Sequence, residues 1–382
     1  MPSSNFYPTV FTPVITRSFV LLLLSVNFLN SCKNSNQQLE IESPVNVIKA
    51  ELAVTAIPCK ASAENTTGMV SIPSGKFIMG AAKQSNTNDA QPAHTVNVDA
   101  FYMDATEVTN GEFTAFVNAT SYQTIAERPI DWEELKLMLP PGSPRPPAQD
   151  LEPGSIVFTP PSNRVSLNDM SRWWRWVKGA NWKHPEGPGS TISGKENYPV
   201  VHIAYQDAEA YAKWAGKRLP TEAEWEFAAR GGLAKQEFAW GSQLTPNGKY
   251  MANYFQGDFP YNNTKLDGFS GLAPVKSFAP NKYGLYDMVG NVWELCSDWY
   301  NAEDFQNSCH KDVEHNPKGP AKTIDPNDAY AIKHVSKGGS YLCSEQYCSN
   351  FKPSGRQGSM HDSGMSHTGF RCVKSKTAIA HI

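Results

Sequence analysis

Two cysteines, Cys343 and Cys348, have the spacing in this sequence that is best suited to chemistry. They stand five positions apart on an irregular segment that follows Gly338-Gly-Ser340, so both sulfur atoms can turn toward one point. Soft thiolates select Cu(I), and two are enough for its near-linear coordination, whereas a closed zinc site needs two more nitrogen or sulfur ligands. Because the sequence holds no second CxxC pair, the spacing favours either copper or a structural disulfide.

The composition excludes several classes of partner and fold. In 382 residues, 34 Lys and Arg face 37 Asp and Glu, and this near-neutral balance gives no basic field for nucleic acid. Aromatic residues make up 11% of the chain, which rules out disorder for most of it. With 27 glycines and 28 prolines, a loop-rich fold is expected rather than a helical bundle or a coiled coil.

The N-terminal segment predicts export. An apolar run, Ser18–Leu29, follows a single arginine and is too short to span a bilayer, which takes about 20 residues. The end of this run, Leu29-Asn-Ser-Cys32, resembles a bacterial lipoprotein signal in which Cys32 becomes the lipidated first residue. Residues 1–32 are therefore expected to be a signal segment, and the polar stretch 33–67 a flexible tether. The protein would be lipid-anchored in a bacterial cell envelope and face the periplasm, or alternatively be secreted.

One domain over 68–375 is expected after the tether, with a tail of 376–382, because no second linker divides the chain. Alternating apolar and polar residues predict a hairpin over Met69–Gly80 and a strand over Thr95–Met103. Eight prolines between residues 140 and 161 predict an irregular surface excursion, and a short buried strand is expected at Pro199–Tyr205. Three helices are expected. The first opens in Glu107–Val117, with Thr109 or Asn110 as its cap, and the second is capped by Asp207 and stops at Gly216. The third is capped by Thr221, with Glu224 completing a capping box, and stops at Gly231.

Several long runs, ordered along the chain, resemble the formylglycine-generating enzymes, or sulfatase-modifying factors. These runs are Val177–Pro188, Gly216–Glu226, Tyr283–Glu294, Gly338–Cys343 and Gly369–Cys372. The resemblance covers roughly 69–373, which is nearly the whole body of the protein. It implies an α+β formylglycine-generating enzyme fold with a C-type-lectin-like core, rich in loops and with little regular secondary structure.

The resemblance also implies an activity. Cys343 and Cys348 fall where the family holds its active-site Cu(I), with a reversible disulfide as the alternative in the metal-free protein. The implied enzyme is a copper-dependent oxidase that uses O₂ to convert a cysteine to Cα-formylglycine. Its partner would be an unfolded client sulfatase that carries a Cys-x-Pro-x-Arg segment. The enzyme itself is expected to be a monomer that contacts the membrane only through its lipid anchor. Four further residues match family positions in or near the pocket: Trp293 on its oxygen side, Ser340 near the substrate, Tyr347 and Arg356.

Two structural Ca²⁺ sites are implied in the same way. Mixed carboxylate, amide and carbonyl oxygens suit this hard cation, whereas turn capping is the plainer role for such residues. The first site would use the side chains of Asn253 and Asp267 with the carbonyl groups of Tyr254 and Phe269. The second would use the side chains of Asp287 and Glu294 with the carbonyl groups of Gly290 and Val292.

The sequence also departs from the family. His367 stands where many relatives carry asparagine, and Gly364 where they carry serine, so the substrate groove is expected to differ there. Asp362 fits the acidic position of the family. The pairing of Cys59, Cys296, Cys309 and Cys372 does not follow from the sequence.

Other functions fit less well. A non-catalytic lipoprotein of the same fold, acting in binding or envelope assembly, would have no reason to keep the two cysteines at copper spacing. An iron-dependent sulfoxide synthase would need an H-x₃-H-x-E pattern, which none of the nine histidines forms. A radical-SAM maturase would need C-x₃-C-x₂-C, which is absent from the sequence.

Overall fold

The computed structural model describes residues 66–81, 88–309 and 312–376. The predicted signal segment, most of the predicted tether with Cys59, and the tail beyond Lys376 lie outside these residues. Within the described ranges, no helix is both long enough and apolar enough to cross a bilayer.

Short strands form five small sheets, which matches the expected loop-rich α+β fold. The sheet orders are β1-β4-β14, β10-β3-β2, β12-β11-β9-β13, β5-β6 and β7-β8. The strands are β1 (Met69–Ile72), β2 (Gly75–Met79), β3 (His94–Val98), β4 (Phe101–Asp104), β5 (Gly154–Phe158), β6 (Trp174–Lys178), β7 (Gly257–Asp258), β8 (Asn262–Asn263), β9 (Trp293–Trp299), β10 (Glu314–His315), β11 (Lys333–Lys337), β12 (Arg356–Met360), β13 (Thr368–Gly369) and β14 (Val373–Ser375).

The four-stranded sheet positions the cysteine segment. Its strand β11 lies antiparallel to both β9 and β12, and β13 lies parallel to β9. The end of β11 at Lys337 pairs with Glu294 near the start of β9, and Thr368 of β13 pairs with Trp293. Gly338 follows β11 directly, so the cysteine segment leaves the sheet at this edge.

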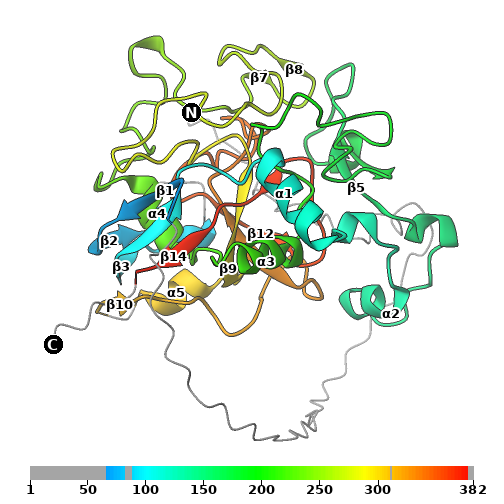
Figure 1. Cartoon of the computed structure of the whole chain (residues 1–382), viewed down its shortest axis with the longest axis horizontal. Helices are drawn as coiled ribbons and strands as arrows, with labels where there is room; N and C mark the ends of the chain where they lie inside the picture. The colour runs from blue at the N-terminus through cyan, green and yellow to red at the C-terminus, as the bar shows by residue number, and fades with distance from the viewer. Residues whose placement is uncertain (1–65, 82–87, 310–311, 377–382) are drawn as a thin grey trace, which may run out of the picture.

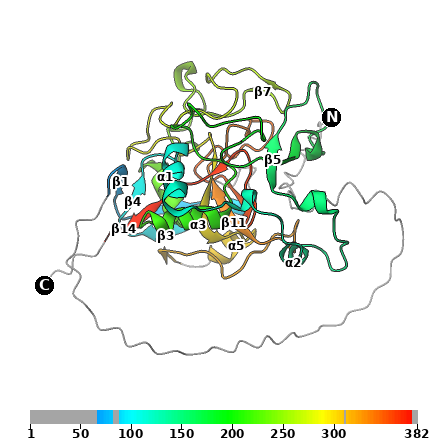
Figure 2. The same ribbon diagram turned by 45° about the vertical axis from the view of Figure 1, so that its right-hand side comes forward.

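Helices cover the sheets, and their caps follow the sequence signals. They are α1 (Asn110–Thr120), α2 (Trp132–Leu135), α3 (Tyr205–Trp214), α4 (Glu222–Arg230) and α5 (Asp304–Ser308). The predicted caps Thr109 and Thr221 are confirmed, each in a full capping box, and Gly231 ends α4 in the left-handed conformation. Figures 1 and 2 place α3 beside α1, and Figure 1 shows mostly loops between α4 and β9, interrupted by the short strands β7 and β8.

Two strand predictions were wrong in their pairing. The segment Met69–Gly80 is not a hairpin, because β1 pairs with β4 whereas β2 pairs with β3 in another sheet. The strand predicted over Thr95–Met103 divides into β3 and β4, with one partner sheet for each half. The last described strand, β14, completes the first sheet beside β4, and Figure 1 shows this red strand next to the blue and cyan ones.

Three other expectations need correction. The proline-rich excursion over 140–161 contains β5, which pairs antiparallel with β6. Residues Pro199–Tyr205 are largely buried but form no named strand, since their backbone bonds go to separate segments. Asp207 does not occupy the cap position of α3. It lies in the first turn, where its carboxylate accepts a hydrogen bond from the Ala204 N–H at 3.0 Å.

Candidate active site

The cysteine segment begins with a turn that only small residues fit. Gly338 and Gly339 both have positive φ angles, of 89° and 73°. A Cβ atom on Gly338 would lie 2.8 Å from the Met288 carbonyl oxygen, and one on Gly339 would lie 2.8 Å from the Phe351 nitrogen. These close approaches fix the direction in which the chain leaves β11.

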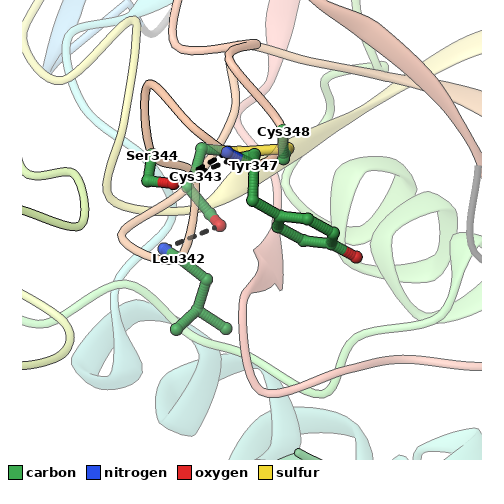
Figure 3. The surroundings of a disulfide bond; sticks show 6 residues. Leu342, Cys343, Ser344, Tyr347 and Cys348 are labelled. Carbon is green, nitrogen blue, oxygen red and sulfur yellow. Dashed lines mark hydrogen bonds between the residues drawn. A yellow bond between two sulfur atoms is a disulfide. The ribbon is translucent and has the colours of Figure 1, made fainter. Parts of the chain in front are cut away.

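Local hydrogen bonds then fold the segment into a compact loop. The Cys343 N–H donates to the Ser340 carbonyl oxygen at 3.0 Å. The Ser344 N–H donates to the Tyr347 carbonyl oxygen at 2.8 Å, and the Tyr347 N–H donates back to the Ser344 hydroxyl at 2.9 Å. Figure 3 shows this turn closing over the two cysteines. The left-handed backbone of Cys348, with φ at 57°, brings its side chain back toward Cys343.

The two cysteine sulfurs meet in the structure, where they form a disulfide with Cα atoms 4.9 Å apart (Figure 3). Cys343 is buried and Cys348 is partly exposed. The predicted convergence of both sulfurs on one point is therefore present. The Cα separation lies in the range that a disulfide needs, and after reduction the same two residues would present two thiolates side by side.

A cavity of about 90 Å³ opens beside the cysteine pair and brings most of the predicted site residues together. Its lining includes the predicted Cys343, Cys348, Ser340, Trp293 and Tyr347, and also His367. Arg356 is not among the lining residues.

Aromatic side chains make one wall of this cavity. The Tyr347 ring stacks on Phe259 with centroids 4.5 Å apart, and it meets Trp173 edge-on at 5.8 Å. Burial raises the pKa of the Tyr347 hydroxyl to about 12, so this group stays neutral at physiological pH. Trp293 is only 1% exposed, and together these rings keep one side of the cavity apolar.

Ser340 lies fully buried at the cavity. Its hydroxyl oxygen accepts a hydrogen bond from the Leu342 N–H at 3.2 Å, so it also stabilises the start of the cysteine segment. The hydroxyl proton is left for another partner, which is compatible with the expected place of Ser340 near a substrate.

Arg356 lies in a buried ion network instead of the cavity. Its guanidinium binds both carboxylate oxygens of Glu222, at 2.8 and 3.0 Å. Lys337 lies between Glu222 and Glu226 at 3.2 and 3.0 Å, and Arg230 binds Glu226 at 2.7 Å. The network joins α4 to the end of β11 and the start of β12, which are the two anchors of the cysteine segment.

The acidic side chains of the second predicted calcium site belong to a buried cluster of carboxylates. Glu294 is bound by Arg371 at 2.6 and 2.7 Å, while burial raises the pKa of Asp287 to about 6. Glu107, which the sequence did not suggest, completes the cluster: burial and the nearby Asp287 raise the pKa of its carboxyl group strongly. Within the described part of the chain, its Oε2 atom is buried without a hydrogen-bond partner. An unpaired buried carboxylate oxygen is the kind of ligand that a hard cation takes, when backbone carbonyl groups supply further oxygens.

The residues of the first predicted calcium site also lie together, but they are already paired. Asp267 accepts hydrogen bonds from the N–H groups of Tyr254 and Phe269 at 3.1 and 2.9 Å. The Asn253 amide donates to the Gly271 carbonyl oxygen at 2.9 Å. No group of three or more His, Cys, Asp or Glu side chains suited to a metal occurs among the described residues, whereas sites completed by carbonyl oxygens need fewer.

The two departures from the family lie in one loop at the cavity. His367 lines it, and Gly364 lies where any side chain would collide, since a Cβ atom there would be 2.2 Å from the His202 carbonyl carbon. Asp362 is buried nearby in the chain. Among the described cysteines, Cys296, Cys309 and Cys372 are free thiols, and the first and last of these are buried. Asn350, which no sequence pattern had indicated, also lines the cavity.

Comparison with known proteins gives consistent results. Residues 55–376 match the family described as "Sulfatase-modifying factor enzyme 1-like domain". The chain is 46% identical over 310 residues to the formylglycine-generating enzyme of Mus musculus, covering 80% of this chain and 75% of the relative. It is 44% identical over 320 residues to the formylglycine-generating enzyme of Thermomonospora curvata, covering 83% and 96%.

More distant proteins mark the limits of the similarity. The protein named inactive C-alpha-formylglycine-generating enzyme 2 of Mus musculus is 37% identical over 315 residues, covering 80% of this chain and 85% of its own length. The structure of PvdO from Pseudomonas aeruginosa has a TM-score of 0.50 at 22% identity, with 81% and 94% coverage, and shows the fold alone. With a domain match over most of its length and relatives above 40% identity, this chain belongs to the formylglycine-generating enzyme, or sulfatase-modifying factor, family.

Proposed function

We propose that this protein is a copper-dependent oxidase that uses O₂ to convert a cysteine in a Cys-x-Pro-x-Arg segment of client sulfatases to Cα-formylglycine. The relatives named formylglycine-generating enzymes support an enzyme that activates sulfatases. Family membership does not decide activity, because an inactive relative is also similar. The proposal therefore depends on the residues of the site.

The convergence of Cys343 and Cys348 in the lining of a partly apolar cavity carries this proposal. The two sulfurs are the soft ligands that Cu(I) prefers, and the turn at Gly338-Gly339 holds the segment that presents them. When bound there, copper would supply the one-electron and O₂ chemistry that protein side chains cannot perform.

The chain's own residues prepare the place of reaction. The rings of Trp293, Tyr347 and Phe259 exclude water from one side of the cavity, which protects reactive species from side reactions. The Ser340 hydroxyl keeps a proton available to a bound client, because its oxygen already accepts from Leu342. The neutral Tyr347 hydroxyl adds a second donor in the cavity wall.

We also propose Ca²⁺ at both sites named above. The buried carboxylates of Glu107, Asp287 and Glu294 support the second site, because Arg371 is the cation that the described part of the chain places against them. The first site has weaker support, since Asp267 already accepts hydrogen bonds from its own turn. A structural role for calcium fits a fold that is mostly loops.

The cellular setting is part of the proposal. A lipid-anchored, periplasm-facing monomer, or alternatively a secreted one, would meet client sulfatases while they are unfolded. The alternative function, a non-catalytic lipoprotein of the same fold, would use Cys343 and Cys348 only as a structural disulfide.

One experiment separates these functions. Reduced protein loaded with Cu(I) is mixed with a Cys-x-Pro-x-Arg peptide, O₂ and a thiol reductant, and the products are followed by mass spectrometry and aldehyde labelling. The enzyme should exchange the peptide thiol for an aldehyde while consuming O₂, and Cys343→Ser should not. A copper-loaded wild-type protein that converts no peptide contradicts the proposal. A peptide with serine in place of cysteine is the substrate control.

A further inference from the structure

Three exposed apolar side chains lie on two segments that adjoin the cysteine cavity. Large apolar residues are exposed at eight positions in the described part of the chain, and three of these are Leu137 at 75%, Tyr330 at 47% and Ile332 at 39%. Apolar residues that are exposed singly are normal on protein surfaces, whereas a group of them marks a place of contact. We call these three residues the apolar patch.

A buried cluster joins the two segments that carry the apolar patch. Leu137 lies in the short 3-10 turn Lys136–Met138 that follows α2, and the other two patch residues immediately precede β11. The side chains of Met138, Ala331 and Met360 pack together, and each residue is no more than 9% exposed. Met138 directly follows Leu137, and Ala331 stands between the other two patch residues. The contact between these anchors therefore brings the patch residues to one region of the surface.

The apolar patch continues into the cavity that holds the cysteine pair. Met360 belongs both to the buried cluster and to the lining of the cavity. It pairs in register with Lys333, which also lines the cavity and directly follows Ile332. The His361 N–H donates to the Ile332 carbonyl oxygen at 2.9 Å, so the pairing of β11 with β12 extends by one residue toward the patch. An extended peptide that leaves the cavity at this end of the two strands therefore meets the patch next.

The segment before β11 is held in place, so the exposure of its two patch residues does not result from a loose loop. The ammonium group of Lys333 binds Asp325 at 2.5 Å and Asp328 at 3.2 Å. The Ala331 N–H donates to the Asp328 carbonyl oxygen at 3.1 Å, and the Asp328 N–H donates to the Asp325 carbonyl oxygen at 3.0 Å. The two carboxylates also neutralise Lys333, so this residue places no unpaired charge between the cavity and the patch.

The occupant that fits this patch is an unfolded chain. The proposed client carries its cysteine while it is unfolded, and an unfolded chain exposes the apolar side chains that its folded form buries. Leu137 and Ile332 offer aliphatic surface, and Tyr330 offers an aromatic ring with a polar tip. Hydrophobic contacts of this kind are non-directional, so one patch accepts the different apolar side chains of different clients.

We propose that the apolar patch binds apolar side chains of the unfolded client outside its Cys-x-Pro-x-Arg segment. This inference rests on the proposed function and extends it, because it assigns a binding surface to the sequence that flanks the motif. Clients with an apolar flank are then preferred over clients with a polar one. An extended flank of about eight residues spans roughly 27 Å, against about 10 Å of chain between Lys333 and Tyr330, so it is long enough to cover the patch.

The test compares three peptides as substrates of the copper-loaded enzyme. They are the Cys-x-Pro-x-Arg segment alone, the segment with a leucine-containing flank of about eight residues, and the segment with serine in place of those leucines, with flanks placed on either side in turn. For one side, wild type should show a KM about fivefold to tenfold lower for the leucine flank than for the serine flank, at similar kcat, because an apolar side chain is partly buried.

The variants assign this preference to the patch. Replacing Leu137, Tyr330 and Ile332 together by serine should abolish the preference, while the unflanked segment is converted as by wild type. Ile78→Ser is the matched control, since Ile78 is 41% exposed on β2, which Figure 1 shows on the opposite side of the molecule from α2. This control should keep the preference, and melting curves should show all variants folded.

A measurement on wild-type protein does not depend on how the variants fold. The leucine-flanked peptide carries a photoreactive diazirine in its flank and is crosslinked to reduced, Cu(I)-loaded protein without O₂. Mass spectrometry should locate the crosslinks on residues 136–138 and 329–332. Excess unlabelled leucine-flanked peptide should abolish them, and the serine-flanked peptide should compete less well.

The outcomes separate the patch from the proposed function. Equal conversion of all three peptides by wild type, crosslinks elsewhere on the surface, or a folded triple variant that keeps the preference or fails on the unflanked segment overturns the patch alone. Sedimentation that finds dimers of wild type but monomers of the triple variant assigns the patch to a second copy, and also overturns it. If wild type converts no peptide, the proposed function fails, and crosslinking of the flank still decides the patch.

Discussion

Replacing Arg356 by methionine separates a structural role from a catalytic one. The resemblance to the family placed Arg356 near the pocket, whereas the structure buries it against Glu222. Its guanidinium makes two charge-assisted hydrogen bonds to that carboxylate, and it donates to the carbonyl oxygens of Asp89 and Asn301 at 2.9 and 3.2 Å. Methionine fills much of the same space and leaves all four acceptor positions without this donor.

The expected cost follows from the partners that remain. Removing one member of a buried ion pair costs about 3–5 kcal/mol. Glu222 keeps Lys337 at 3.2 Å, so the lower end, about 3 kcal/mol, is expected. For a domain of about 300 residues, with an unfolding entropy of about 2.1 cal/mol/K per residue, that loss corresponds to a fall in melting temperature of roughly 5 °C.

The assay combines thermal or urea denaturation with peptide conversion below the melting transition. Arg356→Met should unfold more easily, while the folded fraction keeps a kcat within a few-fold of wild type because this side chain does not line the cavity. Arg175→Met, at an exposed arginine of β6, is the control and should change stability by no more than about 0.5 kcal/mol. An Arg356→Met protein with wild-type stability and a kcat reduced a hundredfold or more would refute the structural role.

Three further predictions concern the same framework. Burial raises the pKa of Asp287 to about 6 and also raises that of Glu107, so the metal-free protein should lose stability as pH rises through 6. Added Ca²⁺ at pH 7.5 should restore the stability of wild type, and should restore less of it in Glu107→Gln. Equal melting curves with and without Ca²⁺ would contradict this prediction. Burial alone would raise the pKa values of Glu222 and Glu226, but the cationic partners of these carboxylates outweigh burial and lower both pKa values. The two carboxylates therefore stabilise the fold above about pH 4.5, and this stabilisation is lost in more acidic buffer. Urea titrations across pH should detect the loss. Gly338→Ala should cost at least about 1–3 kcal/mol in urea denaturation, because φ is 89° and the new Cβ would lie 2.8 Å from a backbone carbonyl oxygen; a neutral effect would mean that the turn relaxes freely.

Local signals in the sequence predicted the starts of α1 and α4, whereas the cap expected at Asp207 was wrong. Thr109 and Thr221 combine a cap side chain with a glutamate three residues later, and each forms its capping box in the structure. Such signals act over a single turn, so they do not depend on distant contacts. The resemblance to the family added the prediction that Cys343 and Cys348 lie together in the active site.

Strand pairing was harder to predict because partners are distant in the chain. The pattern over Met69–Gly80 suits a hairpin, yet β1 pairs with β4 and then β14, almost the whole domain away in sequence. Alternation indicates a half-buried strand without naming its neighbour. For the same reason the sequence did not reveal the partner of Arg356 or the place of Glu107, since both depend on residues more than 100 positions away, Glu222 and Asp287.

Copper binding by the reduced cysteine pair is the most direct test of the proposed chemistry. Cu(I) titration against a chromogenic chelator, with X-ray absorption at the copper edge, should give one copper per chain with two sulfur ligands. Cys343→Ser or Cys348→Ser should abolish that site, while Cys309→Ser, at a free cysteine outside the cavity, should keep it. Reduced wild-type protein that binds no copper, or binds it equally well without Cys343 and Cys348, would contradict the proposal and leave the pair as a structural disulfide.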